Sequence, residues 1–393
     1  MTGRLTGGVT GRSGAAGETA PAMRLYDTAR RAVVPFEPEP VVRMYTCGIT
    51  PYDATHLGHA ATFMVYDVLQ RRLRDRGHDT LCVRNITDVD DPLLVKAGEL
   101  GIHYLDLAAA EVARFDDDMD ALNMLPVHSA PRATSAIGEI RKVVAELIDS
   151  GHAYATGGWV YFEVGRYRPY GQISHYPREE MLDLSAKRGG DPKDPRKRDP
   201  LDFVLWQPSA EGEPAWDSLW GPGRPGWHIE CTALARRELD TDTLDLHGGG
   251  ADLIFPHHEC SAAQSECLTG RPLARHWLHA ALVWKDGHKM SKSLGNLVFI
   301  SDLRKEWDTR AIRLMLLAEH YRHDWEWHEG RLPEAAARLE RWVEAGDGDG
   351  GLDAVRQALD DDLDTPAALA AVDEAARGGL GVSRAARLLG VLD

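Results

Sequence analysis

Two short segments that lie far apart in the chain carry residue types able to bind the phosphates of a nucleotide. The first contains His56, Gly58 and His59, and the second contains Lys289 and Lys292. Imidazoles and the backbone N–H groups of a helix start can receive phosphate oxygens, and lysines can hold a pyrophosphate as negative charge develops on it. Either segment alone could be a polar helix start or a solvated loop. Together, and in this order, they predict an enzyme that activates a carboxylate with ATP.

The first segment is expected at the start of a helix in a nucleotide-binding unit. Residues 41–46 have the composition of a strand, and residues 47–51 predict a turn because they contain Gly and Pro. Thr55 is the expected N-cap of a helix whose apolar residues recur at helical spacing, and residues 81–83 predict the next strand. This order of elements is typical of α/β units that bind ligands at the carboxyl ends of their strands.

The bulk properties limit the class of protein. At 393 residues the chain is long enough for two or three domains, and it has no apolar run of the roughly 18 to 20 residues that would span a membrane. Residues 1–22 lack an apolar stretch, so we expect a disordered leader and not a secretory signal. The net charge of −16 predicts no nucleic-acid partner. Five scattered cysteines predict no disulfide framework and hence a reducing, cytoplasmic setting.

The chain resembles the cysteinyl-tRNA synthetases over about residues 23–328. Seven shared motifs occur in the same order, at residues 47–50, 56–59, 85–91, 226–231, 247–250, 255–259 and 289–293. Within that group it is most similar to the mycothiol-pathway cysteine ligases. The likeness to the ligases rests on the turn from Cys47 onward, on the segment 187–192, where Lys187 replaces the usual Glu, and on a short helical stem.

The resemblance implies an α/β fold with a doubly wound, Rossmann-like parallel sheet, as in class I aminoacyl-tRNA synthetases. It also implies an inserted connective region and a truncated helical C-terminal domain. The expected boundaries are 23–129 and 226–328 for the two halves of the catalytic fold, 130–225 for the insertion and 329–393 for the stem. Within the stem, helical spacing predicts helices at 332–344 and 354–363, and Pro366 begins another.

The same resemblance implies a cytoplasmic ligase acting on ATP, L-cysteine and glucosaminyl-inositol. Magnesium-bound ATP would convert cysteine to cysteinyl-adenylate and pyrophosphate, and the sugar amine would then form an amide and release AMP. Two alternatives remain open. One is a cysteinyl-tRNA synthetase, for which the chain offers no room for an anticodon-recognising domain. The other is a catalytically silent binding module of the same fold, against which the intact histidines and lysines argue.

One Zn²⁺ per chain is also implied, with Cys47, Cys231 and His257 as ligands. An enzyme that selects cysteine over serine must recognise a sulfur atom, and zinc with an open coordination position can bind a thiolate. The synthetases carry a Glu four residues after this His, but here that position is Ser261. Cys260 is the alternative fourth ligand. We expect three protein ligands, completed by water or by the substrate sulfur.

The motifs assign the remaining site residues. Thr50, His56 and His59 are expected to stabilise the phosphates, and Lys289 and Lys292 to close over pyrophosphate. Asp252 is expected to orient the substrate amine or act as base, with an N-cap role as the alternative. The residues expected to bind the substrate and its adenylate are Cys47, Gly48, Ile49, Thr50, Thr62, Asn85, Ile86, Thr87, Trp227, Gly249, Gly250, Ala251 and Val283.

The segment 187–192 is the candidate acceptor site. It offers two cationic side chains, two glycines that permit close backbone approach, and Asp191 to accept sugar hydroxyls. Arg188 and Asp191 are therefore the predicted acceptor-binding residues. The alternative is a flexible linker, since Lys, Arg, Pro and Gly are frequent nearby.

Overall fold

The computed structural model describes residues 22–53, 55–290 and 294–392. The predicted leader lies almost entirely outside these residues, and so does Lys292 of the second phosphate-binding segment. Among the described helices none is both long enough and apolar enough to cross a membrane.

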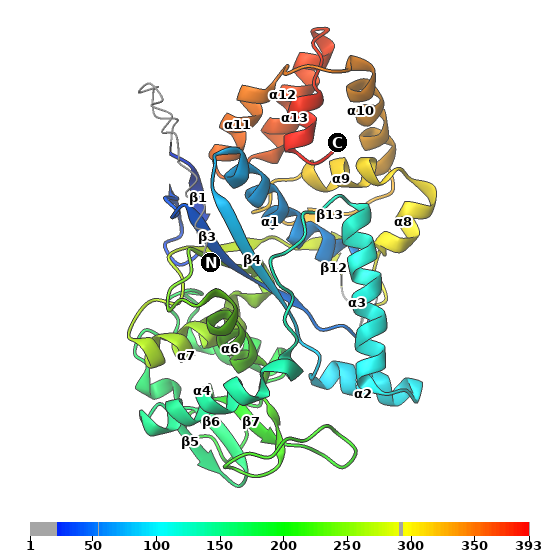
Figure 1. The fold of residues 1–393 in the computed structure, drawn as a ribbon. Coiled ribbons are helices and arrows are strands. Elements are labelled where there is room, and N and C mark those ends of the chain that lie inside the picture. The colour runs from blue at the N-terminus through cyan, green and yellow to red at the C-terminus, as the bar shows by residue number, and fades with distance from the viewer. Residues whose placement is uncertain (1–21, 54, 291–293, 393) are drawn as a thin grey trace, which may run out of the picture.

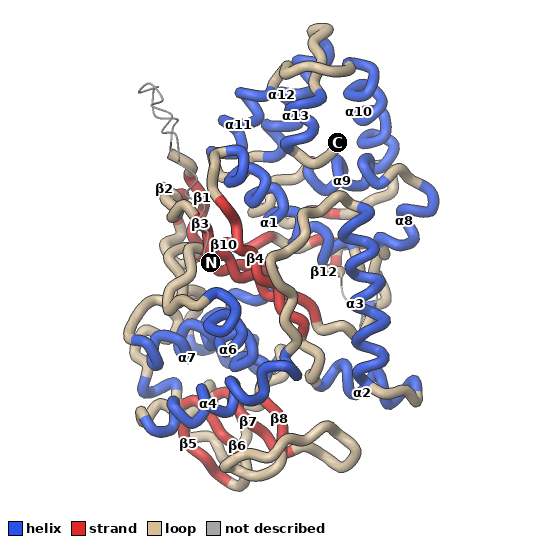
Figure 2. Tube along the Cα trace, in the orientation of Figure 1, coloured by secondary structure: helices blue, strands red, loops and turns tan. Residues whose placement is uncertain are grey.

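The centre of the molecule is a parallel four-stranded sheet with the order β10-β9-β3-β4 (Figure 2). Its strands are β3 (Val41–Ile49), β4 (Asp79–Ile86), β9 (Leu246–Gly250) and β10 (Trp277–Ala280). From β3 the chain proceeds to β4 on one side, and from β9 it proceeds to β10 on the other. The order of strands therefore reverses between β3 and β9, and their carboxyl ends form the crevice where doubly wound sheets bind ligands. The predicted fold class is confirmed.

The predicted turn at 47–51 is partly wrong, because β3 continues to Ile49. Its register with β4 shifts between Thr46 and Ile49, so the chain bulges there and does not turn. Gly48 permits this close approach, since a Cβ atom at that position would lie 1.7 Å from the carbonyl oxygen of Asn85. The sequence pattern could not reveal the bulge, because its cause lies on the neighbouring strand.

Alternating residues of β3 divide the molecule into two cores. Val42 and Met44 belong to a core with α1 (Leu57–Asp75) and the C-terminal helices, whereas Tyr45 and Cys47 belong to a core on the opposite side. That second core includes α4 (Ile137–Asp149), α6 (Trp227–Leu239) and α7 (Glu259–Thr269). Figure 1 shows α1 on one side of the sheet and α6 and α7 on the other.

The start of α1 differs from the prediction. Its N-cap is His56 and not Thr55, because the Nδ1 atom of His56 accepts a hydrogen bond of 3.1 Å from the backbone N–H of Gly58. Thr55 is buried, and its carbonyl oxygen accepts a hydrogen bond from the backbone of Ile300. The ring of His56 therefore fixes the first turn of α1.

The region predicted as an insertion contains a separate antiparallel sheet with the order β5-β6-β7-β8. Its strands are β5 (Ala153–Thr156), β6 (Trp159–Phe162), β7 (Phe203–Pro208) and β8 (Gly223–Pro225), and α5 (Arg178–Lys187) lies between β6 and β7 in the chain. A hairpin of β1 (Arg24–Asp27) and β2 (Ala32–Pro35) precedes the central sheet.

Helices α2 (Asp91–Leu100) and α3 (Tyr104–Ala121) follow β4 in the chain. A small sheet of β11 (Val283–Lys285), β12 (His288–Lys289) and β13 (Trp325–Glu326) follows β10. The C-terminal part is helical, with α8 (Ile300–Glu306), α9 (Thr309–Leu317), α10 (Arg331–Ala345), α11 (Leu352–Asp360), α12 (Thr365–Arg377) and α13 (Ser383–Leu388).

The predicted helices of the C-terminal part correspond to α10, α11 and α12. Helix α11 ends three residues before the predicted end, because Asp362 and Leu363 adopt positive φ angles of 62° and 51°. Pro366 lies in the first turn of α12, as predicted, and Asp364 caps that helix by accepting a hydrogen bond from the backbone N–H of Ala367.

Candidate active site

The first phosphate-binding segment lies beside the residues that follow the second. His56 forms an antiparallel bridge with Phe299, which follows the lysine segment. On either side of that bridge, the backbone N–H of Leu57 donates to the carbonyl oxygen of Val298 at 2.8 Å, and the N–H of Ile300 donates to that of Thr55 at 3.2 Å. The start of α1 is therefore tied to the chain just beyond the lysines.

The histidines and the first turn of α1 form a compact polar surface. The rings of His56 and His59 stack with their centroids 3.8 Å apart. The hydroxyl of Thr62, one turn further on, donates to the carbonyl oxygen of Gly58 at 3.0 Å. A Cβ atom on Gly250 would lie 3.8 Å from the Thr62 hydroxyl, so the start of α1 faces the end of β9.

Asp252 and Lys289 form an ion pair at this edge of the sheet. The Nζ atom of Lys289 lies 2.8 Å from Oδ2 of Asp252. Burial raises the pKa of Asp252, but the adjacent Lys289 ammonium and Arg188 outweigh it, so the pKa lies below its usual value. Gly250 leaves room for the carboxylate, because a Cβ atom there would lie 2.6 Å from Oδ1. Asp252 is therefore an ionised carboxylate that holds a lysine.

Cys47, Cys231 and His257 are brought together from three elements. They come from the end of β3, the first turns of α6, and η4 (Ile254–His258), a single helical turn before α7. The two sulfur atoms lie 3.8 Å apart, and Nε2 of His257 lies 3.2 Å from the sulfur of Cys231. Two sulfurs bound to one tetrahedral zinc would lie roughly 3.8 Å apart, given Zn–S bonds of about 2.3 Å. This buried group could hold a metal ion.

The protonation of the two cysteines differs. A hydrogen bond from Cys47 lowers the pKa of Cys231, and the nearby His257 lowers it further. Burial raises the pKa of Cys47. Cys231 is therefore the thiol of this pair that ionises first. The other ring nitrogen of His257, Nδ1, lies 3.0 Å from Nδ1 of His228, and this contact orients the His257 ring.

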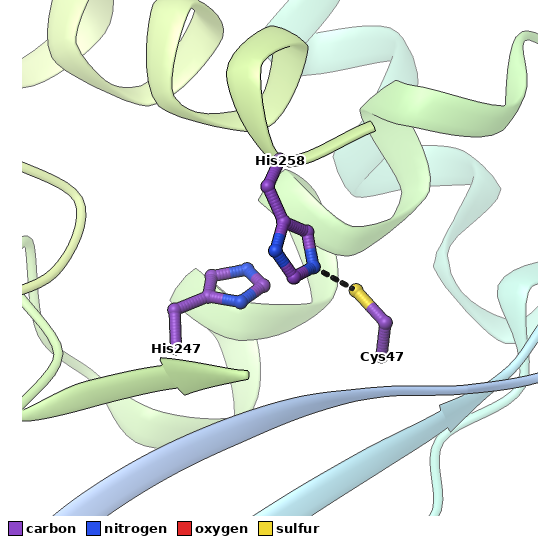
Figure 3. Close-up of side chains that lie close together, drawn as sticks. All are labelled: Cys47, His247 and His258. Atoms are coloured by element: carbon purple, nitrogen blue, oxygen red, sulfur yellow. Dashed lines mark hydrogen bonds between the residues drawn. The ribbon is translucent and has the colours of Figure 1, made fainter. Parts of the chain in front are cut away.

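A second group, which the sequence did not predict, shares Cys47 with the first. It consists of Cys47, His247 and His258, whose ligand atoms also lie within 4.8 Å of one another (Figure 3). The Nε2 atom of His258 lies 3.2 Å from the sulfur of Cys47, and its Nδ1 atom lies 2.7 Å from Nε2 of His279. Burial lowers the pKa values of His247 and His258. Both histidines belong to the shared motifs at 247–250 and 255–259, but no metal-binding role was predicted for them.

Among the described residues, Cys260 and Ser261 belong to neither of the two candidate metal-binding groups. The Ser261 hydroxyl donates to the carbonyl oxygen of His257 at 2.9 Å, so it supports the backbone of a ligand candidate. The sulfur of Cys260 lies 3.3 Å from the hydroxyl of Tyr170. The alternative of Cys260 as a fourth ligand therefore has no geometric support.

Several predicted adenylate-binding residues have structural partners of their own. Oδ1 of Asn85 accepts from the backbone N–H of Gly48 at 2.9 Å, and its amide donates to the Thr87 hydroxyl at 3.1 Å. These bonds fix the ends of β3 and β4, which include Ile49 and Ile86. The carbonyl oxygen of Val283 accepts from the backbone N–H of Met290 at 3.0 Å, next to Lys289.

The remaining predicted residues lie beside His257 and at the end of β9. The ring of Trp227 stacks on His257 with the centroids 4.3 Å apart. Gly249 and Gly250 end β9, and Ala251 begins the short helical turn that carries Asp252.

The two predicted acceptor-binding residues have different surroundings. The guanidinium of Arg188 donates to the backbone carbonyl oxygens of Asp252 and Phe255, which places this residue of the insertion beside the site. The carboxylate of Asp191 accepts from the backbone N–H of Lys193 at 2.9 Å within a local turn. The structure therefore brings Arg188 to the site through backbone contacts.

Comparison with protein families identifies the class of the catalytic domain. The sequence pattern described as "tRNA synthetases class I (C) catalytic domain" matches residues 33–337. That span contains the central sheet, the insertion and both phosphate-binding segments.

Relatives with about half of their residues identical cover most of the chain. The L-cysteine:1D-myo-inositol 2-amino-2-deoxy-alpha-D-glucopyranoside ligase of Thermobispora bispora is 51% identical over 358 residues, which is 89% of each chain. The ligase of the same name from Frankia alni is 54% identical over 85% of this chain and 83% of the relative. That of Mycobacterium marinum is 51% identical over 90% and 88%.

Solved structures share the fold at much lower identity. Mycobacterium tuberculosis methionyl-tRNA synthetase in complex with methionyl-adenylate superposes with a TM-score of 0.64 at 15% identity, covering 89% of this chain and 87% of that one. The Agrobacterium radiobacter leucyl-tRNA synthetase ternary complex gives 0.62 at 10% identity, covering 91% and 83%. These likenesses identify the fold alone.

Proposed function

We propose that this chain, which belongs to the family of L-cysteine:1D-myo-inositol 2-amino-2-deoxy-alpha-D-glucopyranoside ligases within the class I aminoacyl-tRNA synthetases, joins L-cysteine to the amine of glucosaminyl-inositol in mycothiol biosynthesis. One observation carries the proposal. A buried Cys/His group lies near the carboxyl ends of β3 and β9 in one parallel sheet, and the start of α1 and the Asp252–Lys289 pair lie near the end of β9. A sulfur-selective subsite beside a nucleotide site is what activation of cysteine requires.

The first step forms cysteinyl-adenylate. A carboxylate oxygen of cysteine attacks the α-phosphorus of ATP, and the bond to the β-phosphate breaks to release pyrophosphate. His56 and His59 at the start of α1, with Thr50, would receive the phosphate oxygens, and Lys289 would neutralise the charge that develops on pyrophosphate. Lys292 is assigned the same role from the sequence alone. The site acts by positioning and by preorganised charge.

Cysteine selection would rest on Cys47, Cys231 and His257. The donor set of two sulfurs and one imidazole, buried and correctly spaced, fits zinc. Zinc held there would supply an open coordination position for the substrate sulfur. The hydroxyl of serine is a weaker ligand for zinc than this sulfur, so cysteine would be preferred. Trp227 covers His257 and would flank the aminoacyl group.

The second step forms the amide. The neutral amine of the acceptor attacks the carbonyl carbon of the adenylate, the bond to phosphate breaks, and AMP leaves. The attacking nitrogen must lose a proton. Asp252 is the candidate to accept this proton. Its Oδ2 accepts a hydrogen bond from Lys289, and its Oδ1 is the other oxygen, which lies next to Gly250. A carboxylate whose pKa is lowered is ionised at neutral pH and can also orient the amine.

The acceptor would lie between Asp252 and the insertion. Arg188 ties these two parts together, and Asp191 follows it by three residues. We propose that this segment contributes hydrogen-bonding groups to the polyol. Replacement of Arg188 and Asp191 by Ala should then raise the KM for the acceptor and leave cysteine-dependent pyrophosphate exchange intact.

The direct test is product analysis. Purified protein is incubated with Mg-ATP, L-cysteine and glucosaminyl-inositol, and the amide, AMP and pyrophosphate are quantified by mass spectrometry. Equal amounts of the three products are expected, with none when L-serine replaces cysteine. Failure to form the amide by an active, metal-loaded preparation would refute the proposal.

A further inference from the structure

The C-terminal end of α1 and the helical C-terminal part enclose a cationic groove that the ligation reaction does not use. Five arginines line it: Arg71, Arg74, Arg356, Arg384 and Arg387. They come from α1, α11 and α13, and the groove has a volume of about 310 Å³. Asp75 is the only acidic residue in its lining. Such a concentration of arginine is unexpected in a chain whose net charge is −16.

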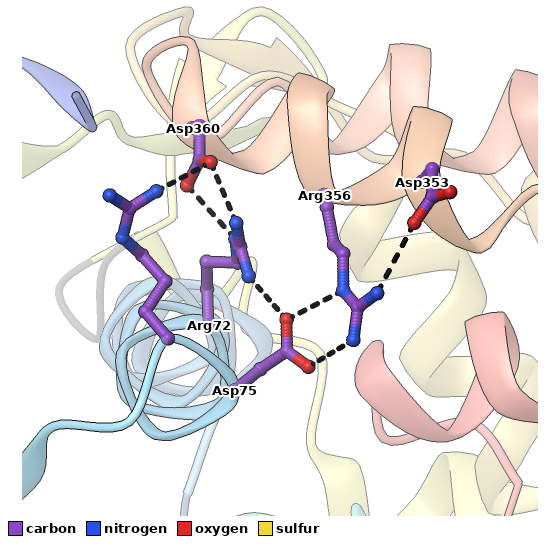
Figure 4. Close-up of polar contacts among 6 residues, drawn as sticks. Arg72, Asp75, Asp353, Arg356 and Asp360 are labelled. Carbon is purple, nitrogen blue, oxygen red and sulfur yellow. Dashed lines mark hydrogen bonds and ion pairs between the residues drawn. The ribbon is translucent and has the colours of Figure 1, made fainter. Parts of the chain in front are cut away.

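The carboxylates nearest the groove are already shared between arginines. Asp75 accepts from both Arg72 and Arg356, and Asp360 accepts from both Arg72 and Arg76 (Figure 4). Asp75 and Asp360 each serve two arginines, whereas Arg356 has a second partner in the exposed Asp353 at 3.2 Å.

Two further groove arginines, Arg71 and Arg384, have carboxylate partners that are shared or distant. Nε of Arg71 lies 2.9 Å from the carboxylate of Asp67. This carboxylate also forms an ion pair with the buried Arg313. Arg384 lies 3.8 Å from Asp349, and both of these side chains are more than half exposed. A long, exposed ion pair is weak and exchanges readily for another anion. The junction thus holds an excess of arginine over carboxylate.

The walls of the groove are fixed before any ligand binds. Nε of Arg313 donates to the carbonyl oxygen of Leu389 at 2.7 Å, and the amide of Asn123 donates to that of Gly390 at 2.9 Å. These bonds hold the end of α13 against α9 and against the residues that follow α3. Leucines, including Leu352 and Leu388, form the apolar part of the lining. A preorganised cluster of guanidinium groups is suited to phosphate, which it can bind in bidentate fashion.

We propose that this groove binds a compact anion carrying two or more phosphate groups. The ligand is compact because the groove is small and because the acidic charge of the whole chain would repel a long polyanion. Since the groove joins α1 to α11 and α13, the bound anion would hold the helical C-terminal part against the helix that begins at His56.

Inorganic tripolyphosphate is a suitable probe, measured by isothermal titration calorimetry. The double variant Arg384→Ala/Arg387→Ala removes two exposed groove arginines. Arg377→Ala, at the end of α12 and outside the groove, is the matched control. Lys289→Ala reports any binding at the active site.

We expect the groove variant to lose on the order of tenfold or more in affinity, because charge-assisted hydrogen bonds are lost. The Arg377→Ala protein should bind as the wild type does. Lys289→Ala should lose any binding at the active site and keep the binding that depends on the groove arginines. Tripolyphosphate should also raise the thermal midpoint of the wild type more than that of the groove variant. Circular dichroism establishes that the variants are folded.

Three results would overturn the proposal. They are no binding to the wild type, equal affinity in the wild type and the groove variant, and loss of binding in Lys289→Ala instead. An RNA oligonucleotide serves as a further arm of the titration. If RNA bound more tightly than tripolyphosphate through the same arginines, the groove would be a nucleic-acid site and not a site for a compact anion.

Discussion

At the scale of single residues, Cys47 occupies a decisive position because it belongs to two groups that could each hold a metal. The first adds Cys231 and His257, and the second adds His247 and His258. Two sulfurs favour the first group as a zinc site. The second group offers one sulfur and two imidazoles, and its His258 also contacts His279.

Metal analysis of single variants separates the two groups. We expect about one zinc per chain in the wild type, lost or weakened in Cys231→Ala and His257→Ala but retained in His247→Ala, because a ligand contributes more than a neighbour of the site. Cys267→Ala is the control, since that cysteine lies in neither group. Loss of zinc in His247→Ala with retention in Cys231→Ala would assign the metal to the second group.

The role of Lys289 is tested by adenylate formation. Lys289→Ala should lower the rate of cysteine-dependent pyrophosphate exchange by about 10² or more, because a charge that stabilises the transition state is removed. Cysteine binding should change little. Lys305→Ala, an exposed lysine on α8, is the control. A variant at Lys289 with the exchange rate of the wild type would remove this residue from the mechanism.

The site was only partly predictable from the sequence, because its residues lie far apart along the chain. Cys47, Cys231 and His257 are too far apart in the chain for their spacing to indicate a metal site, so the prediction depended on the family resemblance. His258 is adjacent to His257, and only the fold determines that the two rings reach different cysteines. The pair of Asp252 and Lys289 likewise depends on how β9 and β12 approach each other.

At the scale of elements, α3 and α8 meet through a buried carboxylate. Nε of Arg304 on α8 lies 3.2 Å from Oδ1 of Asp118 on α3. Burial raises the pKa of Asp118 from 3.8 to about 6, although Arg304 opposes the shift. Because the folded protein holds this proton more tightly than the unfolded chain, the stability contributed by Asp118 is fully present below pH 3.8 and is lost as the pH rises through about 6.

The variant Asp118→Asn should therefore be more stable than the wild type at pH 8. We expect a gain of about 1 kcal/mol in the free energy of unfolding at pH 8 and no gain at pH 4. This gain is smaller than the whole pKa shift of Asp118 would give, because the carboxylate is partly solvated. Urea unfolding at both pH values measures it. A variant that is less stable at pH 8 would show that the ion pair with Arg304 outweighs the cost of burial.

Elements were predictable where their cause is local. The helical spacing in α10, α11 and α12 and the proline in the first turn of α12 are visible in the sequence. The bulge at Gly48 and the capping ring of His56 were not predicted. Both involve residues far away in the chain, because Gly48 packs closely against Asn85 on β4 and His56 pairs with Phe299.

At the scale of the whole molecule, the catalytic domain and the helical C-terminal part are joined by ion pairs. Asp360, which is 7% exposed, accepts from Arg72 and Arg76 at the end of α1. Asp360→Ala should destabilise the protein by about 3 kcal/mol, because it leaves two arginines without this carboxylate in a buried junction. Urea unfolding measures the change, and Asp302→Ala in an exposed pair is the control. Equal stability of the two variants would mean that the junction tolerates the loss.

The global arrangement was predicted from the family resemblance and not from periodicity. Hydrophobic spacing indicated an α/β unit, but the strand order that places β3 beside β9 depends on a crossover of more than 150 residues through the insertion. The acceptor region is the least predictable part, because Arg188 belongs to the insertion and reaches the site only through the fold.

The most direct test of the account is the choice of acceptor in a single turnover. Enzyme carrying preformed radiolabelled cysteinyl-adenylate is divided, and one portion receives glucosaminyl-inositol while the other receives tRNA for cysteine. We predict rapid release of AMP with label in the sugar amide in the first portion, and no transfer of label to tRNA in the second. Label on tRNA, with none in the amide, would identify the chain as a cysteinyl-tRNA synthetase and contradict the account.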